Sequence, residues 1–412
     1  MNVQRPLSAT WFAVLALAGC RDSSDPNPIR EPSHEVENVS QVLTIDHKVP
    51  HISTVPANAG ELVHLFVRER VASNRASRKA VLMIHGLSVP ALPGFELRAD
   101  KYDWALWLAQ AGGLDVFMLD FQGSGLSPRP TMDVPCNVSM AQQALLIPNP
   151  LSATCPATPY PFQLINSKSD WDELDAVVDY IRALRGVDKV ALVSWSQGSF
   201  RVGPYAVQHP DKVESLLLYA PIFNPNFRSG TGADGFAPPV ALPQPGTPMS
   251  LRTRSDLMGL WDAEIAAARE DEAGCGEPVE EGIQNIVWNA IMDNDPVGRT
   301  WGPPGGVMRV RMPFLWGWNA ATARRISVPV LMIRGEFDTG DGGIQDLSRL
   351  YAEIPHAHKM WFTVECAGHR MVWESQRTVL HHISKQWLKH TAVDGYTTGK
   401  FAVDTEGTIH PQ

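Results

Sequence analysis

Short apolar runs alternate with amphipathic helical segments through the middle of the chain, and this alternation restricts the fold more than any other feature. Period-two alternation predicts a strand over residues 61–70, and a continuous apolar run predicts a buried strand over 80–84. Further strands are predicted over 115–120, 190–194, 215–219, 328–333 and 359–364. This order predicts an α/β fold with a mostly parallel sheet covered by helices on both faces.

Helices are predicted between these strands from polar caps and from apolar faces of period 3.6. The clearest one begins at Ser169, which is expected to be its N-cap, has acidic residues in its first turn and ends at Gly186. Further helices are predicted over 102–111, 197–208, 344–352 and 372–389.

Two segments break the alternation. Residues 128–165 form a proline-rich insertion, and residues 223–325 mix glycine, proline and tryptophan with helical pieces. We expect the second segment to be a mainly helical lid over one sheet domain. The expected segments are a core over 45–222 and 326–390, a lid over 223–325 and a C-terminal tail over 391–412.

The N-terminus carries an apolar run over residues 11–18, which is too short to span a bilayer as a permanent helix. It ends in Leu17-Ala18-Gly19-Cys20, a tetrapeptide that resembles the bacterial lipobox. The resemblance implies a signal peptide over 1–19, lipid attachment at Cys20 and a polar tether over 20–44. It also implies a membrane partner through this anchor and a place in the cell envelope. A plain secretory signal, giving a secreted protein, and a buried N-terminal helix are the alternatives.

Four cysteines remain besides Cys20, an even number that permits disulfides in an exported protein. Cys136 and Cys155 flank the proline-rich insertion and are the first pair expected. For Cys275 and Cys366, a disulfide and two free buried thiols are both open.

The charge of the chain excludes one class of partner. Its formal net charge is −9 and it has no block of basic residues. Binding of nucleic acid needs a basic face for the phosphates, so no nucleic-acid partner is expected.

One serine lies where a predicted buried strand turns into a helix. The sequence there is Val-Ser-Trp-Ser-Gln-Gly-Ser, with Ser196 at its centre. It resembles the nucleophile elbow G-x-S-x-G of the α/β-hydrolase superfamily, with Ser194 in place of the first glycine. Small residues are needed there because the strand and helix backbones nearly touch.

Four further turns at strand ends resemble motifs of the same superfamily. Asp338 follows Arg-Gly-Glu-Phe and resembles the acid turn, and His369 follows Cys-Ala-Gly and resembles the histidine loop. His85-Gly86-Leu87 resembles the oxyanion turn. The loop 120–127 resembles D-x-R-G-x-G-x-S with glutamine as its third residue. The resemblance covers residues 45–222 and 326–390.

The resemblance implies a role for each of these residues. Ser196 is the nucleophile, His369 its base, and Asp338 the acid that orients the imidazole. The backbone amides of Leu87 and Gln197 form the oxyanion hole. Two neighbouring acids, Glu336 and Asp341, compete with Asp338 for its role.

The leading functional hypothesis is a serine hydrolase that cleaves a small-molecule or lipid-like carboxylic ester through an acyl-enzyme intermediate. An amidase or peptidase, a lactonase or an acyltransferase would use the same triad. A catalytically silent binding protein is an alternative of another class.

No cofactor is expected, and no metal site. Glycines 123 and 125 do not open a helix as a dinucleotide fingerprint would, and His381 and His382 point to different faces of a helix. Tryptophans of the lid either line a pocket or pack its core: Trp288, Trp301, Trp316 and Trp318.

Overall fold

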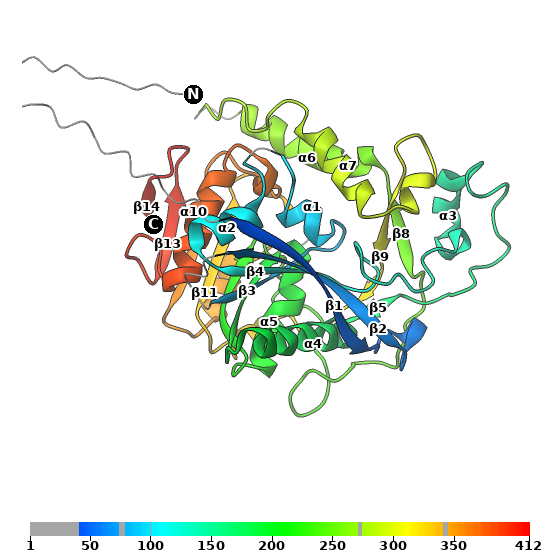
Figure 1. Cartoon of the computed structure of the whole chain (residues 1–412), viewed down its shortest axis with the longest axis horizontal. Helices are drawn as coiled ribbons and strands as arrows, with labels where there is room; N and C mark the ends of the chain where they lie inside the picture. Colours follow the sequence, from blue (N-terminus) through cyan, green and yellow to red (C-terminus); the bar gives the residue numbers. More distant parts are fainter. Residues whose placement is uncertain (1–40, 74–78, 100, 271–273, 341–344) are drawn as a thin grey trace, which may run out of the picture. The chain divides into compact units, whose positions relative to one another are not determined.

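The computed structural model describes residues 41–73, 79–99, 101–270, 274–340 and 345–412. These residues form a ten-stranded sheet in the order β1-β2-β4-β3-β6-β7-β11-β12-β13-β14 (Figure 1). Pairing is parallel from β4 to β13 and antiparallel at both edges, which confirms the expected α/β fold. The strands are β1 (Val42–Ile52), β2 (Leu62–Ala72), β3 (Ala80–Ile84), β4 (Asp115–Asp120), β6 (Val190–Trp195), β7 (Val213–Tyr219), β11 (Val330–Gly335), β12 (Lys359–Val364), β13 (Gly399–Val403) and β14 (Ile409–Pro411).

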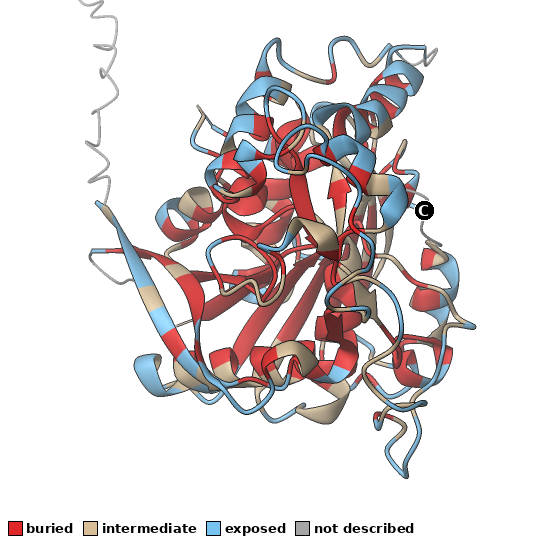
Figure 2. Cartoon of the chain, turned by 90° about the vertical axis from the view of Figure 1, so that its right-hand side faces the viewer, coloured by how far each residue is buried: buried red, intermediate tan, exposed pale blue. Residues whose placement is uncertain are grey.

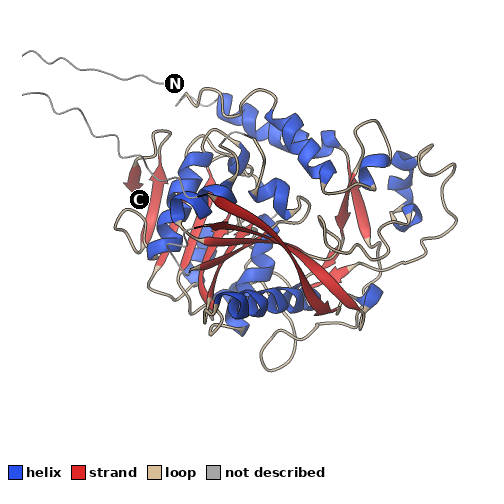
Figure 3. Ribbon diagram, viewed as in Figure 1, coloured by secondary structure: helices blue, strands red, loops and turns tan. Residues whose placement is uncertain are grey.

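Helices cover both faces of the sheet because its central strands are apolar on both sides (Figure 3). In β3, Val81 and Met83 join one apolar cluster, while Leu82 and Ile84 join the other. Figure 2 shows this buried centre with exposed residues on the outer helices. The first cluster contains α1 (Ala91–Phe95), α2 (Trp104–Gly112) and α10 (Arg377–His390), and the second contains α4 (Ser167–Arg185), α5 (Ser199–Gln208) and α9 (Leu347–Glu353).

The first residues of α4 differ from the expectation. The N-cap is Asn166, whose side chain accepts from the amide of Ser169, and the backbone amide of Asn166 in turn donates to the Ser169 hydroxyl. Ser169 is therefore the third residue of the helix and one half of a reciprocal cap. The prediction of Ser169 as N-cap was wrong because both residues are good caps. Gly186 ends the helix in the left-handed region, as expected.

The proline-rich insertion contains three short helical segments. They are followed by β5 (Ile165–Asn166), which pairs with β10 (Pro313–Phe314) of the late insertion. The structure joins Cys136 to Cys155 by a disulfide, with a Cα–Cα distance of 5.7 Å. This is the pairing expected from the sequence. The helical segments are η2 (Pro135–Asn137), α3 (Met140–Gln143) and η3 (Ala144–Leu146).

The late insertion holds strands as well as helices. Its main helices are α6 (Arg254–Arg269) and α7 (Ile283–Asp293), and α8 (Ala320–Ala323) is short. The segment that holds α6 and α7 is flanked by an antiparallel pair, β8 (Met249–Arg252) with β9 (Met308–Arg311), which the expected helical lid did not include. The two strands lie far apart in the sequence, so no turn signal announces their pairing.

The core extends beyond the predicted bounds at both ends. The segment 391–412, expected as a tail, adds β13 and β14 to the sheet. In β13 only Phe401 and Val403 are buried, too few to give a strand pattern. At the other end, β1 begins at Val42, so the last residues of the expected tether belong to the sheet. Cys20 and the expected signal peptide lie outside the described residues.

Along the part of the chain that the structure describes, we find no helix with the length and apolar character needed to span a bilayer.

Candidate active site

Ser196 lies on a sharp turn between a strand and a helix. β6 ends at Trp195, a single 3-10 turn follows over Ser196–Gly198, and α5 begins at Ser199. The φ angle of Ser196 is 56°, in the left-handed region that is costly for serine and typical of strained functional turns. At Gly198 an added Cβ would lie 2.9 Å from the carbonyl oxygen of Ile84, so only glycine fits. This is the geometry of a nucleophile elbow.

Asp338 and His369 meet as a buried pair. The distance between His369 Nδ1 and Asp338 Oδ1 is 2.7 Å, and the two residues are 2% and 5% exposed. The Asp338 carboxylate also accepts from the backbone of Gly340 and the side chain of Gln345. Burial alone would raise the pKa of Asp338, but the charge of His369 and these hydrogen bonds lower it overall. The carboxylate is therefore ionised and able to orient the imidazole.

The competing acid Glu336 has a different partner. Glu336 turns to the backbone of Cys366, whose amide donates to its carboxylate at 3.1 Å. Asp341 lies outside the described residues.

Of the expected catalytic and oxyanion residues, all but Asp338 line one pocket of about 120 Å³. Ser196 and His369 line it together with Leu87 and Gln197, whose backbone amides were expected to form the oxyanion hole. Trp288, Trp301, Trp316 and Trp318 do not line it, because they are buried in the two apolar clusters. The lining residues are Gly86, Leu87, Ser88, Val89, Trp195, Ser196, Gln197, Ile222, Arg252, Leu257, Gly340, His369 and Arg370.

The turn after β3 is held against the elbow by a buried arginine. Arg201 of α5 donates to the carbonyl of His85 at 2.6 Å, and Asp170 accepts from the same guanidinium at 2.8 Å. An added Cβ at Gly86 would lie 3.2 Å from the Cβ of Ser196, which shows how closely this turn approaches the serine. His85 itself is fully buried and donates from Nδ1 to the carbonyl of Gly86. Burial lowers its pKa well below the ordinary value, so it stays neutral and braces the turn.

The loop from residue 120 to 127 is built around buried polar groups. The Asp120 carboxylate accepts from the amides of Ala91 and Leu126, which fixes both α1 and the loop. Gln122, at the position where the resembling motif has arginine, donates to Ser53 and Glu173. This loop contributes no lining residue to the pocket and supports its surroundings.

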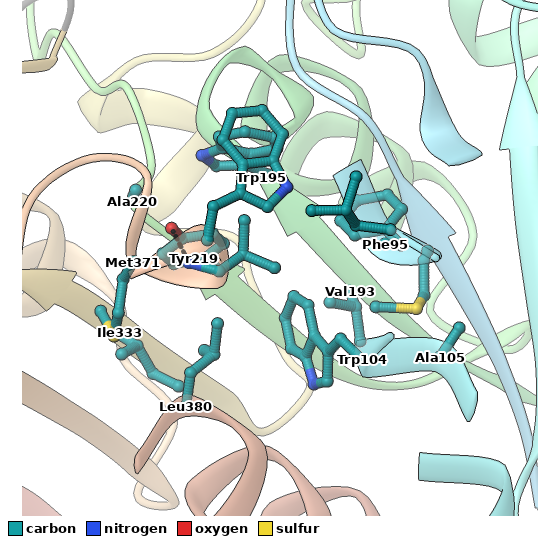
Figure 4. Close-up of a cluster of buried hydrophobic side chains, with 14 of the residues drawn as sticks. Phe95, Trp104, Ala105, Val193, Trp195, Tyr219, Ala220, Ile333, Met371 and Leu380 are labelled. Carbon is teal, nitrogen blue, oxygen red and sulfur yellow. Dashed lines mark hydrogen bonds between the residues drawn. The ribbon is translucent and has the colours of Figure 1, made fainter. Parts of the chain in front are cut away.

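The histidine loop rests on two aromatic side chains at the ends of β6 and β7. Trp195 and Tyr219 stack with ring centroids 5.7 Å apart, within the cluster drawn in Figure 4. Both donate to the carbonyl of His369, from the indole nitrogen at 3.1 Å and from the hydroxyl at 2.9 Å. The tyrosine hydroxyl in turn accepts from the amide of Val372. Tandem hydrogen bonds from a rigid core thus fix the backbone that carries the imidazole.

Two buried glutamates hold the same loop from the other side. Glu264 of α6 accepts from the amide of His369 through one oxygen and from the amide of Thr339, next to Asp338, through the other. Glu374 accepts from the amide of Gly368 at 2.6 Å and from Trp261 of α6 at 2.9 Å. The inserted helix α6 therefore takes part in positioning both the acid turn and the histidine loop.

Sequence reasoning missed Glu264, although a signal was available. In α6 the buried stripe runs through Leu257, Trp261, Ile265 and Ala268, and Glu264 lies within it. A carboxylate on the apolar face of a helix needs a partner, so its position alone indicates a polar contact beneath the helix.

A second disulfide reaches the histidine loop. Cys366, three residues before His369, is bonded to Cys275 with a Cα–Cα distance of 5.3 Å. Of the two alternatives left open for these cysteines, the structure shows the disulfide. It links the chain that follows α6 covalently to the loop that carries the imidazole.

The burial of Glu374 makes the stability of the protein depend on pH. Burial raises the pKa of this carboxyl from 4.5 to about 8, so the folded protein keeps a proton that the unfolded chain releases. Its contribution to stability is complete below pH 4.5 and declines as the pH rises toward 8, by up to about 1.4 kcal/mol per pH unit.

Glu374→Gln mimics the protonated carboxyl, so we expect it to flatten this decline. The measurement is the free energy of unfolding in urea at pH 5, 6, 7 and 8, with the exposed Glu277→Gln as the matched control. An equal pH dependence in the wild type and Glu374→Gln would contradict the prediction.

The described residues offer no cluster of three or more histidine, cysteine or acidic side chains suited to a metal ion. His381 is buried and stacks on Trp107, whereas His382 lies beside Asp394 at the surface. The two adjacent histidines thus face different surroundings.

Comparison with known proteins identifies the family of this fold. The model of the alpha/beta hydrolase family matches residues 81–381. No curated protein sequence matches the chain.

Among solved structures, the chain is similar to several hydrolases at low identity. A serine hydrolase from the polyaromatic-hydrocarbon-degrading bacterium Cycloclasticus zankles is 13% identical, with a TM-score of 0.47 over 84% of this chain and 98% of that one. An esterase from Thermogutta terrifontis is 15% identical, with a TM-score of 0.45 over 83% and 98%. The naproxen esterase of Bacillus subtilis is 12% identical, with a TM-score of 0.42 over 84% and 92%.

These likenesses concern the fold alone, whereas the family match extends over most of the described chain. The strand order and the strand–turn–helix elbow at Ser196 are consistent with this match, and the chain belongs to the α/β-hydrolase family.

Proposed function

We propose that the protein is a serine hydrolase that cleaves a carboxylic ester through an acyl-enzyme intermediate. The observation that carries the proposal is the buried His369–Asp338 pair, whose histidine lines the same pocket as a serine held at positive φ. A serine hydroxyl becomes a strong nucleophile only when a base takes its proton, and the base needs an acid to orient it.

In the first step the Ser196 hydroxyl attacks the carbonyl carbon of the ester while His369 Nε2 takes its proton. The amides of Leu87 and Gln197 donate to the oxyanion of the tetrahedral intermediate, each contributing about 10²–10³ to kcat. His369 then gives the proton to the departing alcohol, and the acyl group stays on Ser196. Water repeats the sequence on the acyl-enzyme and releases the acid.

The size of the pocket favours a small substrate group beside Ser196. About 120 Å³ is below the usual range of sites that enclose drug-sized ligands, about 300–1,000 Å³. Two disulfides within the described residues support the export of the protein, because disulfides persist outside the reducing cytoplasm. We propose a lipid anchor at Cys20 on the likeness of residues 17–20 to a lipobox.

The test is hydrolysis of p-nitrophenyl esters from acetate to palmitate, together with labelling by a fluorophosphonate probe. We expect labelling, and the highest kcat/KM on the shortest acyl chains because the pocket is small. Labelling without turnover of any ester would contradict the ester assignment and direct the search to amides, lactones or acyl transfer. If neither labelling nor turnover occurs, the protein is a binding protein on a hydrolase fold.

A further inference from the structure

Among the described residues, the pocket is lined by positively charged side chains and by no negatively charged ones. Two arginines, Arg252 and Arg370, line it beside Ser196 and His369. No acidic residue lies among the described residues of the lining. A pocket with this lining attracts anions, since fixed positive charge in a partly enclosed site focuses the local potential.

The charge of Arg370 is paired within the protein. It is 1% exposed, and its guanidinium lies 3.4 Å from the carboxylate of Glu264. The same is true of the other buried arginines nearby. On β9, Arg309 pairs with Asp295 and Arg311 pairs with Asp170. The charges of these arginines are therefore neutralised by buried carboxylates of the protein.

Arg252 differs from all of these. It is the last residue of β8 and is half-buried, and its neighbour Leu251 is packed in an apolar cluster. Because side chains alternate along a strand, Arg252 points away from that cluster, on the side where it lines the pocket. Within the described residues its guanidinium has no hydrogen bond, ion pair or aromatic partner. Its nitrogen atoms remain open to solvent, so the guanidinium is free to bind an anion in the pocket.

We infer that the ester carries a free carboxylate, which Arg252 binds while Ser196 attacks the ester carbonyl. The inference rests on the proposed function and specifies its substrate class. A guanidinium matches the planar geometry of a carboxylate and can donate two parallel hydrogen bonds to it. Because the pocket is small, only a short carbon chain separates the carboxylate from the scissile ester.

The experiment compares each anionic ester with a neutral amide of the same shape. For a carboxylate on the acyl side the pair is ethyl hydrogen glutarate and ethyl glutaramate. For the alcohol side it is 3-acetoxypropanoate and 3-acetoxypropanamide. In the wild type we expect kcat/KM of the carboxylate to exceed that of its amide about tenfold to a hundredfold in one of the two pairs, which identifies the side.

The variant is Arg252→Gln, in which we expect the ratio to fall close to one. The matched control is Arg254→Gln, two residues further along the chain, where the guanidinium is exposed and bonded to Asn285. There the ratio should stay at the wild-type value, and Arg252→Lys should restore part of the preference.

Two results would overturn the inference while leaving the proposed function intact. One is hydrolysis of both members of each pair at equal kcat/KM. The other is a carboxylate preference that persists in Arg252→Gln. Failure of the proposed function has a different signature, since then neither pair is hydrolysed and the fluorophosphonate probe leaves Ser196 unlabelled.

Discussion

Replacing Ser196 with alanine is expected to reduce kcat for ester hydrolysis about 10⁶-fold, which corresponds to about 8 kcal/mol of transition-state stabilisation. The acyl-enzyme cannot form without the hydroxyl. Binding and the oxyanion hole survive, so a residual rate above that of water should remain. The measurement is kcat on the best p-nitrophenyl ester, with unfolding in urea to show that the variant is folded.

Ser194→Ala is the matched control for this experiment. Ser194 is two residues away on β6, and its buried hydroxyl has no hydrogen-bond partner within the described residues. Removing it deletes the same atom type two residues before Ser196, so activity should stay within a few-fold of the wild type. A Ser196→Ala variant with activity like that of Ser194→Ala would contradict the assignment of the nucleophile.

Asp338→Asn should lower kcat by up to about 10⁴-fold with little effect on KM, because a neutral amide no longer stabilises the positive charge that the imidazole gains. The side chain keeps its shape, and its oxygen can still accept from the backbone of Gly340. The same oxygen accepts from His369 Nδ1, so the loss reports on the charge of the carboxylate. Steady-state kinetics on one ester, with kcat and KM separated, measures it.

Glu336, two residues before Asp338, provides the control for this prediction. Glu336→Gln keeps an acceptor for the amide of Cys366, so its kcat should stay within a few-fold of the wild type. A large loss in Glu336→Gln beside a small loss in Asp338→Asn would show that the acid of the triad had been assigned to the wrong carboxylate.

Much of the candidate site could be predicted because its residues lie at strand ends. The carboxyl ends of parallel strands meet at one edge of the sheet, so short turns after β3, β6, β11 and β12 converge without any knowledge of the loops. Ser196, Asp338 and His369 each carry a local pattern of glycine and a polar residue after an apolar run. Their meeting in the structure follows from topology alone.

The residues that hold the site in place could not be predicted from the sequence in the same way. Trp195 and Tyr219 look like ordinary core residues in sequence, and only the folded loop shows that both donate to the carbonyl of His369. The pairing of β8 with β9 and the position of Arg252 depend on contacts between segments more than 50 residues apart. Such contacts leave no periodic signal, because the hydrophobic pattern of each segment predicts its own secondary structure and not its partner.

The position of Glu264 makes the candidate site depend on the insertion. Its carboxylate belongs to the inserted helix α6, yet it accepts from the amides of Thr339 and His369 on the core. Any opening that lifts α6 withdraws these acceptors from the two loops that hold the acid and the base. The alignment of the acid turn with the histidine loop is therefore coupled to the position of the inserted helix α6.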